Sequence, residues 1–506
     1  MTRPVLFHVF LIIYWFQCSW VGFAQTPGKE QESVFQVVER NREAIALVGD
    51  NIYYFAELGM QEIESSRLMT EVLEEAGFTV ERGLSGMSPA FLATYGSGKP
   101  VIAIHTEFDS TPGNSQTPSI TDHTPLVEGA PGHAEGHNVN AAVMIGAAFA
   151  VKTVLEEYQL EGTLKIFGAP AEEQLISRPY FVRDGYFDDV DIVFHPHIGS
   201  DFQTQYGLRQ YALISAKFHF QGESAHGAVS PWKGRDALDA AELMDLGFDK
   251  FREHLEPTQR SHRVITSGGV QPNVIPDTAT IWWFFRESTA EKVSAIFERA
   301  REIAQGAALM TQTTFSVEIM SAVWPSRANQ TAAEVIQKNI ELVGMPEWSQ
   351  QEQTLARELQ TKREVKPVGL VTRISPLSGP SRQGTSANDS GDLTWLVPTG
   401  RLTFPSNIPG IAAHHWAAGV APATSLAHKG AVAGAKVLAA SVMDFFIDAQ
   451  LLSKAKATFK EEIAGIEFKS LLPADQQPPL DLNQEIMDRF RPLMRKDYLD
   501  EKPRFR

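Results

Sequence analysis

The chain has 506 residues, 43% of them hydrophobic and 21% charged, and it carries a formal net charge of −16. This composition excludes an intrinsically disordered chain, and the length allows two to four folded domains. The acidic balance argues against nucleic-acid binding, because a phosphate backbone is bound by clustered Lys and Arg side chains.

Residues 1–24 have the pattern of a secretory signal peptide. Arg3 is the only charge before an apolar stretch at 5–16, and small residues precede a cleavage site at Gln25. The alternative is an uncleaved anchor, but the apolar stretch is shorter than the ~20 residues of a membrane span. We expect a secreted or periplasmic protein without a membrane segment. Cys18 is the only cysteine, so after cleavage any metal site must use His, Asp and Glu.

Strands that alternate with helices predict a mostly parallel, doubly wound α/β sheet. The chain has a helical pattern from 33 to 78, and apolar runs beyond it indicate strands around a helix of small residues. The expected strands are 101–104, 164–168 and 192–194, and the expected helices are 141–155, 331–343 and 427–446.

Residues 207–325 are predicted to form an inserted α+β domain of ferredoxin-like order. Its expected elements are strands at 212–220, 263–266, 280–285 and 314–320 and helices at 237–254 and 291–309. We therefore expect a discontinuous metal-binding catalytic domain at 25–206 and 326–506, with 207–325 as a lid and dimerisation domain. The tail after Ser453 has no predicted role.

Five clusters of His and carboxylate residues stand out, and three of them directly follow predicted strands. Ligands bind at the carboxyl ends of strands in such sheets, and imidazole and carboxylate are the ligands of hydrolytic zinc or manganese. Each cluster alone is also compatible with a solvated loop or a capped turn. The clusters are 105–113, 133–138, 168–173, 194–197 and 413–416.

The adjacent carboxylates Glu172 and Glu173 repel one another unless a cation or a proton lies between them. In a metal hydrolase one of the two can bind metal while the other acts as general base. On a solvated helix start, the same pair would only complement the helix dipole.

The chain resembles the amidohydrolase branch of the aminoacylase/carboxypeptidase family of two-zinc peptidases. The stretches that carry the resemblance are EFDSTPG (107–113), GHAEGHN (132–138), PAEE (170–173), FHP (194–196), GESAHGA (222–228), GVQPNVIP (269–276), DSGD (389–392), HHW (414–416) and AHKG (427–430). They run in family order over most of the chain.

The resemblance implies a role for each matching residue. The implied metal ligands are Glu135, His137, Glu173, His195 and His414. Glu172 would be the general base, and Asp109 would orient a ligand imidazole. Glu135 departs from this branch, which usually has Cys there, although a carboxylate can bridge two cations as well as a thiolate can. His197 competes with His195, His415 is the weaker alternative to His414, and the role of Glu107 stays open.

In the lid, the resemblance implies that His226 crosses a homodimer interface and stabilises an oxyanion. Asn273 and Arg286 would hold the substrate carbonyl and carboxylate, and an Arg matches a carboxylate bidentately. The alternatives are an ordinary interface His and a structural ion-pair Arg.

The expected enzyme is therefore an amidohydrolase with two divalent cations, zinc or manganese. It would cut an amide bond in an N-acyl amino acid or an aminobenzoyl-glutamate-like substrate. A dipeptidase of the same family is the nearer alternative, and an inactive scaffold subunit is the more distant one.

Overall fold

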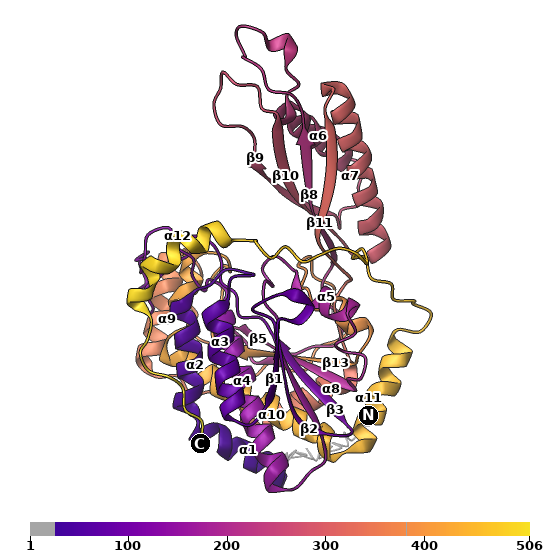
Figure 1. Ribbon diagram of the computed structural model, residues 1–506. Helices are drawn as coiled ribbons and strands as arrows, with labels where there is room; N and C mark the ends of the chain where they lie inside the picture. The colour runs from indigo at the N-terminus through magenta and orange to yellow at the C-terminus, as the bar shows by residue number, and fades with distance from the viewer. Residues whose placement is uncertain (1–25, 381) are drawn as a thin grey trace, which may run out of the picture.

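The computed structural model describes residues 26–380 and 382–506, so the predicted signal peptide lies outside the described residues. The larger sheet has the strand order β1-β2-β4-β3-β5-β13-β6 (Figure 1). Its strands are β1 Thr79–Arg82, β2 Phe91–Ser97, β3 Val101–Thr106, β4 Gly162–Gly168, β5 Ile192–Gly199, β6 Gln203–Thr204 and β13 Thr399–Pro405. The central strands β4, β3, β5 and β13 are parallel, and the edge strands pair antiparallel.

Helices cover both faces of this sheet. One face packs on α4 (His137–Glu157) and α10 (Ser425–Ile447), which are long and apolar but mostly buried inside the domain. The same side carries α1 (Lys29–Arg40), α2 (Arg42–Phe55), α3 (Ile63–Glu75), α8 (Gln330–Val343), α9 (Gln350–Lys362) and α11 (Ala449–Glu462). The short α5 (Ser177–Arg183) and η3 (Asp392–Trp395) cover the other face.

The second sheet has the order β11-β8-β10-β9 and is antiparallel throughout. Its strands are β8 Ala212–Gln221, β9 Arg260–Ser267, β10 Thr278–Glu287 and β11 Thr314–Val323, and α6 (Ala237–Arg252) and α7 (Ala290–Thr311) pack on one face. Because β7 (Gly207–Leu208) pairs with β12 (Arg327–Ala328), the chain leaves and re-enters the first domain at adjacent points. The predicted fold class, a doubly wound catalytic domain with an inserted α+β lid, is confirmed.

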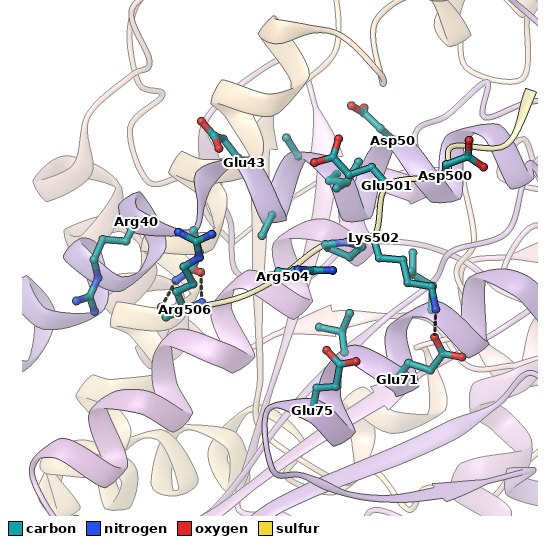
Figure 2. Close-up of a pocket in the computed structure, with 17 residues that line it drawn as sticks. Arg40, Glu43, Asp50, Glu71, Glu75, Asp500, Glu501, Lys502, Arg504 and Arg506 are labelled. Carbon is teal, nitrogen blue, oxygen red and sulfur yellow. Dashed lines mark hydrogen bonds and ion pairs between the residues drawn. The ribbon is translucent and has the colours of Figure 1, made fainter.

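The C-terminal tail, which had no predicted role, packs along the first domain and ends against α2 and α3. Between the tail and these helices lies a cleft of about 960 Å³ lined by charged side chains (Figure 2). Asn41 donates to the carbonyl of Arg506 at 2.9 Å and accepts from its N–H at 2.7 Å, and Lys502 pairs with Glu71 at 3.1 Å. The tail, which includes α12 (Gln484–Met494), thus fixes the outer helices of the domain.

Candidate active site

The five His and carboxylate clusters converge at the carboxyl ends of the parallel strands. Within them, two groups of three potential ligands have donor atoms within 4.8 Å of one another. The first group is Glu107, His137 and His197, and the second is Glu135, Glu173 and His414. The residue before His137 is Gly136 at φ 109°, where a Cβ would lie 2.5 Å from Ile198 Cδ1, so the turn into α4 requires glycine.

In the first group, Asp109 fixes the orientation of His137. Asp109 Oδ1 lies 3.0 Å from His137 Nδ1, and Oδ2 accepts the backbone N–H of Glu173 at 2.9 Å. The other ring nitrogen, His137 Nε2, is buried without a hydrogen-bond partner among the described residues. A buried imidazole held on one side and bare on the other is the arrangement of a metal ligand.

In the second group, His414 lies between two carboxylates. Its Nε2 is 2.8 Å from Glu135 Oε2 and 3.0 Å from Glu173 Oε2, and these contacts raise the pKa of His414 to about 10. Burial acts to raise the pKa of Glu135, but the hydrogen bond from His414 and the charges of His137, His197 and His414 together outweigh it and lower that pKa to about 2. Glu135 Oε1 also lies 3.5 Å from His197 Nε2, so Glu135 stands between the two groups.

These donors fit divalent cations. Each group combines imidazole nitrogen with carboxylate oxygen, the ligand set of zinc and manganese hydrolases, and His137 Nε2 and Glu173 Oε1 are buried without partners among the described residues. Glu135 and Glu173 both turn a carboxylate oxygen towards His414 Nε2, at 2.8 and 3.0 Å. The site therefore has the chemistry to hold divalent metal, and Glu135 lies between the two ligand groups.

His195 lies outside both groups and is buried behind Glu107. Its Nε2 is 2.9 Å from Glu107 Oε2, and its ring centroid lies 4.4 Å from that of His105, with the two ring planes tilted by 31°. The alternative ligand, His197, lies in the first group instead. Along β5 the residue between them turns to the other face of the sheet, and His197 lies nearer the strand end and the cavity. His415 belongs to neither group, and its Nδ1 accepts the N–H of Ala417.

Glu107 joins the first group to a buried ion-pair network that sequence reasoning missed. Arg178, fully buried on α5, pairs with both Glu107 and Asp389, and its Nε donates to His105 Nδ1 at 2.8 Å. Asn140 Nδ2 donates to Glu107 at 3.0 Å. The available signal was Arg178 itself, a charged residue directly before the apolar run PYFV (179–182) on the helix that follows the Glu172 turn.

Glu172 is held beside the first group but belongs to neither. Its Oε1 accepts from Asn388 Nδ2 at 2.5 Å, and its Oε2 lies 3.9 Å from His137 Nε2. Burial raises the pKa of Glu172 well above its usual range, and the nearby carboxylates of Glu107 and Asp389 add to this. Ala171 precedes it at φ 58°, a left-handed turn whose N–H donates to Glu62 Oε1 at 2.7 Å. A carboxyl group with a raised pKa in this position suits proton transfer.

The lid residues divide into two sets. Arg286 lines a cavity of about 540 Å³ together with Glu135, Glu172, Glu173, His197 and His414. His226 and Asn273 do not line it. They are exposed in neighbouring loops, where the N–H of Gly227 donates to the carbonyl of Asn273 at 2.9 Å. These loops lie at the end of the lid that points away from the first domain (Figure 1).

Comparison with known proteins agrees with this architecture. Residues 208–310 match the family model described as a peptidase dimerisation domain. The chain is 32% identical over 469 residues to a subunit of p-aminobenzoyl-glutamate hydrolase from Escherichia coli, covering 87% of this chain and 97% of that protein. It is also 30% identical over 258 residues to indole-3-acetyl-aspartic acid hydrolase of Enterobacter agglomerans, covering 49% of this chain and 57% of that protein.

Solved structures share the fold. An aminobenzoyl-glutamate utilization protein of Klebsiella pneumoniae superposes with a TM-score of 0.56 at 17% identity, covering 81% of this chain and 98% of its own. A dinuclear metal-binding peptidase of Bacillus subtilis, from the M20 family, superposes with a TM-score of 0.52 at 16% identity, covering 81% and 99%. The chain therefore belongs to the M20 family of metal-dependent amidohydrolases and peptidases.

Proposed function

We propose that the protein hydrolyses the amide bond of an N-acyl amino acid or of an aminobenzoyl-glutamate-like compound. The observation that carries this proposal is the pair of ligand groups that meet at Glu135, with Glu172 buried beside them and bonded to Asn388. The relatives named as hydrolases of aminobenzoyl-glutamate and of an indole-acetyl amino acid support the substrate class.

In this proposal Glu107, His137 and His197 hold one divalent cation, Glu173 and His414 hold the other, and Glu135 lies between them. Zinc or manganese suits this donor set. When bound, the cations supply the Lewis acidity that makes water nucleophilic near neutral pH. His195 keeps Glu107 in place and is not itself a ligand, which revises the role expected for it from sequence.

Glu172 is the general acid and base. Its Oε1 accepts a hydrogen bond from Asn388, and its Oε2 lies on the side of His137 Nε2. Oε2 is therefore the oxygen that accepts a proton from the attacking water. It then returns that proton to the leaving nitrogen. Arg286, on the lid side of the same cavity, holds the substrate carboxylate.

His226 and Asn273 enter the site, in this proposal, from the second subunit of a homodimer. His226 Nδ1 accepts the N–H groups of Ala228 and Val229 at 3.1 and 3.2 Å, so the neutral ring carries its proton on Nε2, as an oxyanion donor requires. The edge strand β9 and the exposed Leu246 of α6 offer the surface for pairing, and the family model that matches this region is a dimerisation domain. The protein is also proposed to act outside the cytoplasm, after signal removal, without a membrane or nucleic-acid partner.

Metal analysis and a substrate panel test this proposal. We expect close to two divalent cations per chain and hydrolysis of at least one class among N-acyl amino acids, dipeptides and aminobenzoyl-glutamate. Protein that binds neither zinc, manganese nor cobalt and cleaves nothing would instead be a scaffold subunit. Cleavage of dipeptides alone would make it a dipeptidase of the same family.

A further inference from the structure

Four arginines line the cavity that is bordered by the second ligand group and by His197. Arg382 is exposed, and the other three come from different elements of the chain. Arg286 comes from β10 of the lid, Arg209 follows β7 at the junction of the two domains, and Arg401 lies on β13 of the large sheet. All three are half-buried, and each has an Nε atom that is shut off from solvent without a hydrogen-bond partner among the described residues.

In the described part of the chain, none of these three guanidinium groups forms a salt bridge with Asp or Glu. Burial, with the charge of Arg401 adding to it, lowers the pKa of Arg209 to about 9. Burial also lowers the pKa of Arg401, although Glu107 and Glu172 act from a distance in the opposite direction.

Arg178 shows how the same chain satisfies a buried guanidinium internally, because it pairs with both Glu107 and Asp389. Guanidinium groups that are partly shielded from water and have no carboxylate partner are unfavourable in the free protein. Their arrangement therefore points to an anion that arrives from outside.

Arg209 and Arg401 lie close enough for the charge of one to act on the other. Arg209 Nη1 donates to Gln205 Oε1 at 3.0 Å, and Arg401 Nη1 donates to Gln210 Oε1 at 3.0 Å. Gln210 is itself held by the hydroxyl of Ser326 at 2.7 Å. Amide oxygens fix both guanidinium groups without neutralising them, which leaves their charge for a ligand.

We infer that Arg209 and Arg401 form a second carboxylate subsite, so the amino acid released by this enzyme is dicarboxylic. The inference rests on the proposed function, in which Arg286 takes the carboxylate next to the cleaved amide. A substrate with two carboxylates would engage Arg286 with one and the Arg209 and Arg401 pair with the other. A substrate with one would leave the Arg209 and Arg401 pair without an anion.

The test compares N-acyl-L-glutamate with N-acyl-L-glutamine, which has nearly the same shape and one charge less, on the metal-loaded full chain. We expect the glutamate compound to have the higher kcat/KM. Arg209→Gln and Arg401→Gln should each lower that value by roughly 30-fold or more and remove most of the preference. Arg209→Lys should retain part of it, and Arg286→Gln, the matched control, should lower both substrates alike. Thermal melting checks that each variant folds.

Equal kcat/KM for the two substrates in the unmodified protein would overturn the inference, as would an equal loss on both in Arg209→Gln and Arg401→Gln. If no amide is cleaved at all, the proposed function fails, and calorimetry with free L-glutamate and L-glutamine then tests the subsite alone. Tighter binding of L-glutamate that disappears in Arg401→Gln supports the subsite. Equal binding of the two amino acids refutes it.

Discussion

Glu172 and Glu173 are neighbours in the chain, yet their side chains have different surroundings. Glu173 faces His414 at 3.0 Å, inside a ligand group, whereas Glu172 bonds to Asn388 at 2.5 Å. The left-handed turn at Ala171, held by Glu62, sets the direction in which the pair leaves the strand. One peptide unit therefore separates a residue suited to bind a cation from one suited to carry a proton.

Replacing Glu172 by Gln should remove proton transfer and leave the metal in place. The amide keeps the size of the side chain and can still bond to Asn388, so we expect kcat to fall by about 10²- to 10⁴-fold with unchanged metal content. Glu173→Gln is the control and should lose metal as well as activity. Should the two variants behave the opposite way round, the assignment of the pair is reversed.

Glu135 should be needed for metal retention because it lies between the two ligand groups. Its carboxylate approaches His414 at 2.8 Å on one side and His197 at 3.5 Å on the other. We expect Glu135→Ala to lower metal occupancy and activity together, and Glu135→Cys to restore part of both, since a thiolate can also bridge. Full metal occupancy in Glu135→Ala, measured by elemental analysis, would contradict this role.

The two histidines of β5 should separate ligand binding from support. His197→Ala is expected to lower metal occupancy, because it removes a donor from the first group. His195→Ala should keep most of the metal but weaken the fold, because it leaves the buried Glu107 without one of its hydrogen-bond donors. Metal analysis and thermal melting of both variants distinguish the roles, and loss of metal in His195→Ala alone would restore His195 as the ligand.

At the scale of elements, sequence periodicity identified the strands that position the site because β3, β4 and β5 are short, apolar and buried. It missed β13, whose sequence TGRLTFP mixes Gly and Pro with polar residues, and α9, which is polar on most of its surface. Which of His195 and His197 is the ligand depends on where β5 ends, and the partners of Arg178 depend on tertiary packing. The spacing of residues along the chain predicts neither.

Asp392 at the start of η3 should make stability depend on pH. It is fully buried and accepts the N–H of Trp324 at 2.8 Å, where β11 returns from the lid, and burial raises its pKa to about 7. Between its ordinary value of 3.8 and about 7 the folded protein keeps a proton that the unfolded chain has released. This group therefore lowers the free energy of unfolding as the pH rises through that window.

Asp392→Asn removes this titration while keeping an acceptor for Trp324. Relative to the unmodified protein, the variant should gain stability as the pH rises from 4 to 8, by up to about 4 kcal/mol. Denaturant unfolding of both metal-free proteins at a series of pH values measures the difference. A difference that stays constant with pH would show that Asp392 is ionised in the folded state.

At the scale of the whole molecule, the lid stands away from the first domain and carries two implied site residues at its far end (Figure 1). His226 and Asn273 lie in adjoining loops, with an isolated β-bridge between His226 and Val274. The fold places these two residues close to each other, but neither lines the active-site cavity of its own chain. A second protomer whose lid pairs through β9 would supply them, and closure of the lid within one chain is the alternative.

Mixing two inactive variants separates these arrangements. One variant carries His226→Ala and the other Glu172→Gln, and each alone should have little activity, because every site in its homodimer lacks one of the two groups. If His226 acts across the interface, a mixed dimer contains one site with both groups intact, so a random mixture should recover up to about a quarter of the unmodified activity per chain. Sedimentation must show dimers, and exchange of labelled protomers must be demonstrated before the assay. If protomers exchange and no activity returns, His226 serves its own chain or only packs, and the roles of the ligand groups and of Glu172 are unaffected.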